Sequence, residues 1–282
     1  MQNSLMKEGT HSTHLRSVLN EKGRKLTMLD LCGIDSLGNK RFKLMGFLSE
    51  AARQGKTSLI SVGGNRSNHL HALAHIGQEV NMTTIGIVRG EERSTPTLDD
   101  CKAKGMMLHF VSRSEFVERH SSDFTASWLE QYPKALFIPE GGSGCLGTLG
   151  VANMLSGIDL SIYNRVVLPV GSGGTYMGLL RLLGNRLWGY PMVHDASLSK
   201  RMQGFLPTAN SFDIQLDYAA AGRGFAKLRP EDLEFQDYFL SETDVLLDKT
   251  YNLKLARYLF QDESWSGHWL WINTGGLQAD RE

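Results

Sequence analysis

The stretch RVVLPVGSGGTYMGLLRLLG, residues 165–184, decides the fold class. RVVLPV is a short, β-branched, mostly apolar run, which predicts a buried strand, and YMGLLRLLG has the apolar spacing of a helix. Between them lies the glycine-rich turn GSGGT (171–175), at the carboxyl end of the predicted strand. Ligands bind at this edge of parallel sheets, and the N–H groups of a glycine turn before a helix can surround a phosphate. The stretch therefore predicts one strand–turn–helix unit of an α/β protein.

The turn alone leaves its ligand open. Many strand-to-helix turns are rich in glycine for packing reasons, so a phosphate site and a simple packing turn are both compatible with GSGGT. The turn lacks the Gly-Lys-Ser/Thr of a P-loop and is not a complete G-x-G-x-x-G, which argues against a nucleotide. If it binds a phosphate monoester, the binding residues are Gly171, Ser172, Gly173, Gly174 and Thr175.

Similar units lie on both sides of this stretch. LISVGG (59–64), TTIGIVRG (83–90) and ALFIPEGG (135–142) are short apolar runs, each followed by a segment long enough for a helix, and HWLWINTGG (268–276) predicts a last strand. Strands that alternate with helices are typical of a parallel sheet covered on both faces. The sequence therefore predicts an α/β fold without tandem repeats.

Composition restricts the class of function. The 282 residues include 30 basic and 30 acidic side chains, so the net charge is zero, and neither nucleic acid nor a membrane surface is an expected partner. The apolar runs are too short to span a bilayer, and the N-terminal residues do not resemble a signal peptide. Cys32, Cys101 and Cys145 are isolated and lack the spacing of metal ligands. We expect three reduced thiols in a cytoplasmic protein.

A second glycine turn, GGNRSNHLHA (63–72), leads from a strand into a helix. Ser67 and Asn68 stand where a helix N-cap is expected, and by itself this pattern indicates only a cap. His71 and His75 are four residues apart on one helical face, but no Glu or Cys nearby completes a metal site. We therefore predict no metal.

Lys40 stands in LGNKRFKLMGFLSEAARQG, where the turn Gly38–Asn39 precedes a helical pattern. The positive potential of a helix N-terminus and of the neighbouring Arg41 and Lys43 favours a neutral, nucleophilic amine. Most lysines are nevertheless solvated surface charges. Position alone therefore makes Lys40 a candidate nucleophile and no more.

The segment GNKRFKL (38–44) resembles the one that holds the Schiff-base lysine in pyridoxal-5′-phosphate (PLP) enzymes of the tryptophan-synthase-β fold type. More narrowly, it resembles the D-cysteine desulfhydrase and 1-aminocyclopropane-1-carboxylate (ACC) deaminase family. Further stretches resemble that family in the same order: SVGGNRSNHLHALA, RGEERSTPTLDDCKAKGMMLHFVSRSEF, IPEGGSGCLGTLG, GSGGTYMGL and INTGGLQ. The resemblance runs from about Leu31 to Gln278, which is nearly the whole chain.

The resemblance implies an architecture and a cofactor. The fold would be the two-domain PLP fold type II, with parallel sheets flanked by helices and PLP in the cleft between the domains. Residues 1–44 and 153–282 would form the larger, PLP-binding domain, and residues 45–152 a smaller inserted one. The substrate would be a small amino acid, and the chain would form a homodimer.

The resemblance also assigns roles to particular residues. Lys40 would carry the cofactor as a Schiff base and move the substrate's α-proton, and Asn68 would hydrogen-bond the 3′-oxygen of the cofactor. Ser67 would lie beside the substrate carboxylate or the reacting carbon, and GSGGT would hold the phosphate. The remaining implied positions are Thr274 near the pyridine ring, Tyr251 as a catalytic residue that also contacts substrate, and Asn39 and His69 in the substrate pocket.

Two departures from the family pattern bear on the reaction. Asn252 stands where deaminases have Glu and desulfhydrases Thr, and Phe225 replaces a second active-site tyrosine. Thr274, in contrast, matches the desulfhydrases, since deaminases have Leu there. We therefore expect a D-cysteine desulfhydrase-like reaction, giving pyruvate, sulfide and ammonia. The alternatives are ACC deamination, racemisation with Ser67 or Tyr251 as the acid opposite Lys40, and a degenerate PLP-binding homologue with little catalysis.

Overall fold

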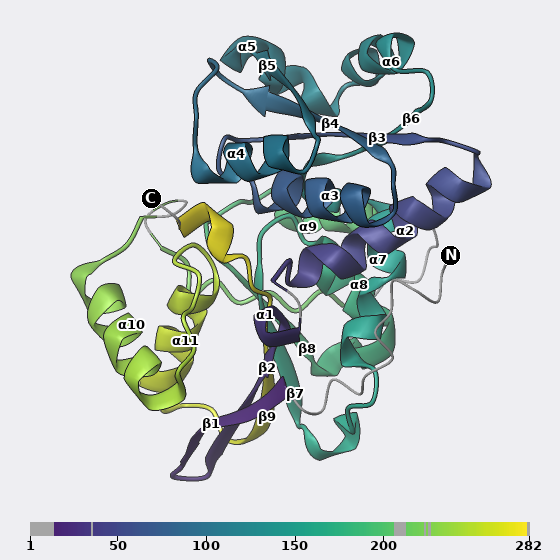
Figure 1. The fold of residues 1–282 in the computed structure, drawn as a ribbon. Coiled ribbons are helices and arrows are strands. Elements are labelled where there is room, and N and C mark those ends of the chain that lie inside the picture. The colour runs from purple at the N-terminus through teal and green to yellow at the C-terminus, as the bar shows by residue number, and fades with distance from the viewer. Residues whose placement is uncertain (1–13, 35, 206–212, 223, 225–226, 281–282) are drawn as a thin grey trace.

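The computed structural model describes residues 14–34, 36–205, 213–222, 224 and 227–280 (Figure 1). Phe225, one of the departures noted above, lies outside these residues. Within them the chain forms two sheets with helices on both faces of each, which confirms the predicted α/β class. None of the helices in the described ranges has the length and apolar character that crossing a bilayer requires.

The first sheet has the order β1-β2-β9-β7-β8. Its strands are β1 (Leu15–Glu21), β2 (Arg24–Asp30), β9 (Gly267–Asn273), β7 (Arg165–Val170) and β8 (Leu187–Pro191). Only β1 is antiparallel to its neighbour; the other pairs are parallel. Side chains alternate between the two faces of a strand. In β9, Leu270 and Ile272 accordingly pack on one side, and Trp269 and Trp271 on the other.

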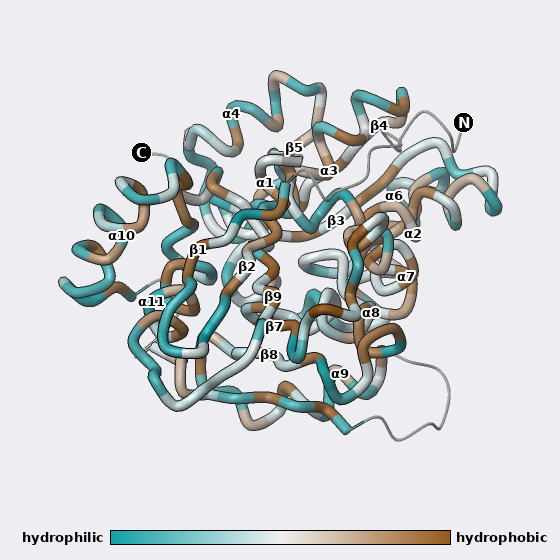
Figure 2. Tube along the Cα trace, turned by 90° about the horizontal axis from the view of Figure 1, so that it is seen from below, coloured by the Kyte–Doolittle hydropathy of each residue, from teal (hydrophilic) through white to brown (hydrophobic). Residues whose placement is uncertain are grey.

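Helices cover both faces of this first sheet. On the Leu270 side lie α8 (Gly174–Leu183) and α9 (Leu198–Gln203), and on the Trp271 side lie α10 (Pro230–Thr243) and α11 (Asn252–Gln261). Figure 2 shows hydrophobic residues on β7 and β9 at the centre and hydrophilic residues on α10 at the edge. Burial on both faces explains why RVVLPV is a continuous apolar run and not an alternating one.

The second sheet is wholly parallel, with the order β5-β4-β3-β6. Its strands are β3 (Ser58–Gly63), β4 (Thr83–Arg89), β5 (Met107–Val111) and β6 (Ala135–Ile138). One face packs on α2 (Asn39–Arg53), α3 (Asn68–Glu79) and α4 (Pro96–Ala103), and the other on α5 (Arg113–Val117) and α6 (Ser122–Gln131). Two further short helices are α1 (Leu31–Ile34) and α7 (Cys145–Leu149).

Each sheet is drawn from one of the two predicted domains. The strands of the second sheet all lie between residues 45 and 152, and those of the first lie outside that range. However, α2 begins at Asn39 and ends at Arg53, so it crosses the predicted limit at residue 44. The domain limits therefore stay a prediction.

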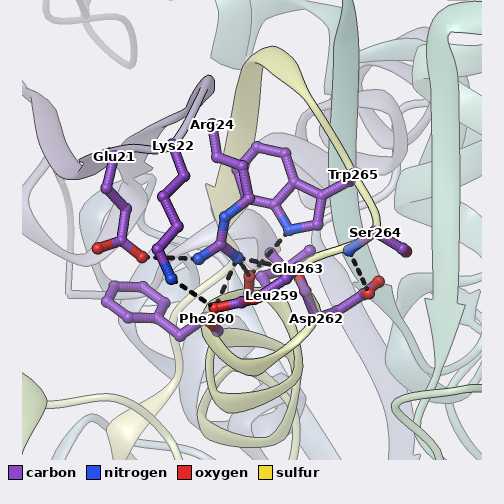
Figure 3. A network of polar contacts seen from close by, with 9 residues as sticks. All are labelled: Glu21, Lys22, Arg24, Leu259, Phe260, Asp262, Glu263, Ser264 and Trp265. Carbon is purple, nitrogen blue, oxygen red and sulfur yellow. Dashed lines mark hydrogen bonds and ion pairs between the residues drawn. The ribbon is translucent and has the colours of Figure 1, made fainter.

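Arg24 holds the end of α11 against the first sheet (Figure 3). Its side chain is 2% exposed, and Nη2 lies 2.7 Å from Glu21 Oε1. Nη1 donates to the carbonyl oxygens of Leu259, Phe260 and Asp262 at 3.4, 3.3 and 2.8 Å. The last carbonyls of a helix have no partner within it and carry the negative end of its dipole. A buried guanidinium on β2 thus completes the hydrogen bonding of the last turn of α11.

Replacing Arg24 with methionine is expected to lower the free energy of unfolding by about 3 kcal/mol, because buried carbonyls lose their donor. Urea denaturation followed by circular dichroism measures this. The matched control is Lys22→Met, which breaks a bond of 2.9 Å to Glu263 between side chains that are 66% and 65% exposed. Exposed pairs contribute little, so the control should resemble the wild type. Equal stability of the two variants would contradict the assignment.

Candidate active site

The predicted site residues meet at the N-terminus of α2. Asn39 is the contact point, since its Nδ2 donates to Thr175 Oγ1 at 2.9 Å and its backbone N donates to Thr274 O at 3.0 Å. Asn68, the first residue of α3, donates from Nδ2 to Gly276 O at 2.8 Å. The loops after β3, β7 and β9 are therefore brought together with the segment that carries Lys40.

A glycine allows α2 to begin where it does. Gly38 has a φ of +55°, a value that other residues rarely adopt, and a Cβ there would lie 2.4 Å from Thr274 O. Only glycine fits at this close approach of two backbones. The start of α2 is thereby fixed against the loop after β9, and Lys40 falls in its first turn.

The amine of Lys40 has a lowered proton affinity. Its Nζ donates to Asn39 Oδ1 at 2.9 Å. Burial of the amine lowers the pKa of Lys40 to about 8, while the nearby charge of Asp248 acts in the opposite direction. The sequence had suggested that the neighbouring cations lower this pKa, but burial is the main cause. Arg41 pairs with Glu79 at 2.8 Å. Removal from water makes the amine of Lys40 neutral in a useful fraction of molecules near neutral pH.

Lys43, one turn further along α2, is a site residue to which the sequence assigned no role. It is 2% exposed, and its Nζ donates to Gly141 O at 2.6 Å and to Ser172 Oγ at 3.4 Å. Burial lowers the pKa of Lys43 well below its usual value, and Lys40 lowers it further. The three-residue spacing from Lys40, which places both on one helical face, was the available signal.

Lys43 and the GSGGT turn together fit a phosphate. A Cβ on Gly174 would lie 2.9 Å from Lys43 Cε, so the glycine leaves room for the ammonium at the start of α8. Gly173 has a φ of +87°, and a Cβ there would lie 2.3 Å from Met202 Cγ. In the described part of the chain, no carboxylate forms an ion pair with Lys43. A buried amine beside a helix N-terminus and a glycine turn suits an anion, which would favour its protonated form.

His69 lies in the same region as a neutral base. Ser61 Oγ donates to Ile138 O at 2.6 Å, so it must accept the hydrogen bond of 2.9 Å that joins it to His69 Nε2. Nδ1 is then the bare nitrogen, and among the described residues it has no hydrogen-bond partner although it is buried. Burial, followed by Lys43 and Lys40, lowers the pKa of His69 well below its usual value. His69 is therefore an acceptor at the site.

Ser67 and Tyr251 each have a structural contact of their own. Ser67 caps α3, its Oγ accepting from Leu70 N at 3.2 Å, as the simple reading of its sequence predicted. Tyr251 packs on the GSGGT turn, since a Cβ on Gly171 would lie 3.0 Å from Tyr251 Cε1. Burial raises the pKa of Tyr251, and Asp248 and Glu140 raise it further, so its hydroxyl stays protonated.

Asn252, the first residue of α11, connects this helix to Thr274. Asn252 is fully buried, and its Nδ2 donates to Asp248 Oδ2 at 2.5 Å and to Thr274 Oγ1 at 3.2 Å. Its Oδ1 accepts from Thr274 N at 3.3 Å. A glutamate here would put a second carboxylate beside Asp248, which like-charge repulsion disfavours. The amide at this position is thus explained by its neighbours.

Across the described ranges, no group of three or more His, Cys, Asp or Glu side chains could hold a metal ion. His71 Nε2 lies 3.3 Å from Asp100 Oδ2, and its ring is 4.3 Å from that of His75. Cys32, Cys101 and Cys145 form no disulfide.

The chain was compared with protein families and known proteins. No family model matches it. The bifunctional D-cysteine desulfhydrase/ACC deaminase of Arabidopsis thaliana is 29% identical over 283 residues, which span 88% of this chain and 71% of that protein. The D-cysteine desulfhydrase of Salmonella choleraesuis is 26% identical, over 89% of this chain and 85% of that enzyme.

Solved structures agree with this similarity at the level of the fold. An ACC deaminase homologue superimposes with a TM-score of 0.75 at 20% identity, covering 99% of this chain and 95% of that one. Threonine deaminase and a PLP-dependent aspartate racemase also share the architecture, which is PLP fold type II. By sequence over most of its length, and by fold, the chain is a homologue of the D-cysteine desulfhydrases and ACC deaminases.

Proposed function

We propose that the protein is a PLP-dependent enzyme that removes thiol and ammonia from a small amino acid, with D-cysteine as substrate. The observation that carries this proposal is the pair Lys40 and Lys43. One is an amine with a pKa of about 8, and the other is a buried lysine amine at a glycine turn. An aldehyde cofactor with a phosphate group needs a nucleophilic amine and an anion site. Lys40 would provide the amine, and Lys43 would provide the anion site.

Different residues of the site would bind different parts of the cofactor. When bound, PLP supplies an electron sink for the substrate's α-carbon. Lys40 would attach to it covalently, and Lys43 with residues 171–175 would hold its phosphate. Asn68 and Thr274 would contact the ring. Their positions beside α2 follow from the hydrogen bonds of Asn39 and Asn68.

The remaining side chains would act on the substrate. Lys40 would take the α-proton, after which the thiolate leaves the β-carbon, and water completes conversion to pyruvate, hydrogen sulfide and ammonia. Ser67, Asn39, His69 and Tyr251 would line the substrate pocket. The neutral His69 and the protonated Tyr251 add no charge that would repel a substrate carboxylate.

The choice of D-cysteine rests on Thr274 and on the named activities of the relatives. ACC deamination is the alternative, because the Arabidopsis relative is named for both activities. Asn252 is engaged by Asp248 and Thr274, and it offers no carboxylate where the deaminases have one. A racemase on the same scaffold is a further alternative.

An absorption spectrum of the purified protein tests the proposal. We expect a visible band with PLP that changes on addition of D-cysteine, with pyruvate accumulating. If D-cysteine leaves the band unchanged and ACC yields 2-oxobutyrate, the enzyme is a deaminase. A protein that binds no PLP would overturn the proposal and leave the degenerate homologue.

Replacing Ser67 with alanine is expected to lower turnover about 100-fold if the hydroxyl assists proton transfer. Loss of the N-cap should also reduce the free energy of unfolding by about 1 kcal/mol. Ser67→Asn separates the two effects, because asparagine keeps a capping oxygen but has no hydroxyl. Initial rates and urea denaturation of both variants give the comparison. Wild-type turnover in Ser67→Asn would exclude a catalytic role for the hydroxyl.

A homodimer in the cytoplasm is part of the same proposal. The support for the dimer is the family resemblance, and the support for a reducing compartment is three cysteines without a disulfide. Light scattering of the purified protein measures the mass of the assembly directly.

A further inference from the structure

A cavity lies between the start of α10 and the length of α11, apart from the candidate active site. Its volume is about 220 Å³, and none of the proposed cofactor or substrate residues lines it. The lining residues that matter are Gly222, Lys227, Arg229, Asp232, Lys254 and Arg257. Figure 1 shows α10 and α11 packed side by side, and both lie against one face of the first sheet.

The lining of this cavity is strongly basic. It includes the cations Lys227, Arg229, Lys254 and Arg257 and a single carboxylate, Asp232, so its formal charge is 4 − 1 = +3. Asp232 is already engaged, accepting from Arg257 Nε at 2.6 Å and from Arg229 N at 2.7 Å. Three cations therefore remain without a carboxylate among the described residues that line the cavity.

Of these three cations, Lys254 gives the strongest indication of a bound anion. It is 3% exposed, and in the described part of the chain its ammonium makes one hydrogen bond, 3.3 Å long, to Gly224 O. An ammonium has three donors, and burying it with one long bond is unfavourable. Burial lowers the pKa of Lys254. A Cβ on Gly222 would lie 2.9 Å from Nζ, so the glycine keeps the space beside the ammonium open.

Two further features favour an anion over other ligands. Helix α10 has 14 residues and begins at Pro230, so its positive N-terminus lies between Arg229 and Asp232 at the cavity wall. A neighbouring cavity that shares Tyr258 is lined by the carboxylates Asp217 and Asp262 and by one cation, Arg165, so its formal charge is 1 − 2 = −1. An anion is therefore favoured in the basic cavity over its neighbour.

We propose that this cavity is a binding site for a small, multiply charged oxyanion, held by Lys254, Lys227 and Arg229. Phosphate, sulfate and polycarboxylates share this chemistry, because all three offer several acceptors to these cations. The site is separate from the GSGGT turn and does not depend on the proposed enzymatic activity.

Isothermal titration calorimetry of the PLP-loaded protein at constant ionic strength tests this, with inorganic phosphate, sulfate and citrate as probes. We expect one anion per chain, and affinity at least about tenfold weaker in the double variant Lys227→Ala/Arg229→Ala, whose side chains are exposed. Lys254→Met should abolish binding. A difference among the three probes identifies the type of oxyanion that fits best.

The control variant is Arg53→Met, which removes an exposed cation that pairs with Glu50 and lies outside both sites, and it should bind these anions as the wild type does. An equal loss of affinity in Arg53→Met would mean that the loss of any cation weakens binding, and would overturn the proposal. So would unchanged affinity in the Lys227→Ala/Arg229→Ala variant, or no heat with any probe at about 10 mM. If the protein binds no PLP, the same titrations apply to the cofactor-free chain, so the two proposals fail separately.

Discussion

Replacing Lys40 with alanine is expected to lower D-cysteine turnover about 10⁴-fold or more, because one amine would both attach the cofactor and carry the α-proton. Pyruvate formation at saturating PLP measures the loss, and the visible band should change with it. Lys40→Arg is the matched control, since it keeps a positive charge but cannot become neutral. Activity in Lys40→Arg would show that charge, and not a nucleophilic amine, is what the site requires.

The pH dependence of Lys40 gives a second measurement of the same prediction. Only the neutral amine reacts with an aldehyde, so the rate of PLP capture by cofactor-free protein should rise about tenfold per pH unit up to about pH 8 and then level off. The charge of Asp248 raises the pKa of Lys40, so Asp248→Asn should move the break to lower pH. A break near the ordinary value of 10.5 would contradict the burial of this amine.

Replacing Lys43 with methionine is expected to have two effects of opposite sign. PLP binding should weaken about 100-fold, because the phosphate loses a buried cation. The cofactor-free protein, in contrast, should gain about 1–2 kcal/mol in the free energy of unfolding, because a buried polar amine without a carboxylate is replaced by an apolar chain. Spectral titration with PLP and urea denaturation measure the two quantities.

Arg41→Met is the control for Lys43, since Arg41 lies on the same helix but pairs with Glu79 away from the turn. It should alter neither quantity strongly. A Lys43→Met variant that unfolds more easily and binds PLP normally would mean that the lysine supports the fold through Gly141 O and not the cofactor.

The strand–turn–helix units could be predicted because burial on both faces makes their strands continuously apolar. RVVLPV is β7, and LISVGG and HWLWINTGG contain most of β3 and β9. β1 was missed because it is a half-exposed edge strand, whose pairing with β2 depends on tertiary contact. β8 was missed as well, since LWGYP contains a glycine and a proline.

The site could be named from sequence only where a local motif exists. Lys40, Ser67 and Asn68 stand in such motifs, although their catalytic roles stay predictions. The contacts of Lys43 with Gly141 and of Asn252 with Thr274 join distant parts of the chain. No local sequence pattern predicts contacts between residues so far apart in the chain. The cause of the low pKa of Lys40 was likewise hidden, because burial is a property of the folded molecule.

The position of β9 has a consequence for synthesis on the ribosome. β9 lies between β2 and β7, yet it is the last of these strands to be translated. The second sheet uses strands from one continuous stretch, so it can assemble while the rest of the chain is still being made. β2 must wait for its inner partner, with one edge open to pairing with other chains. Substitutions that weaken β9 should therefore reduce the yield of correctly assembled protein more than the activity of each molecule that folds.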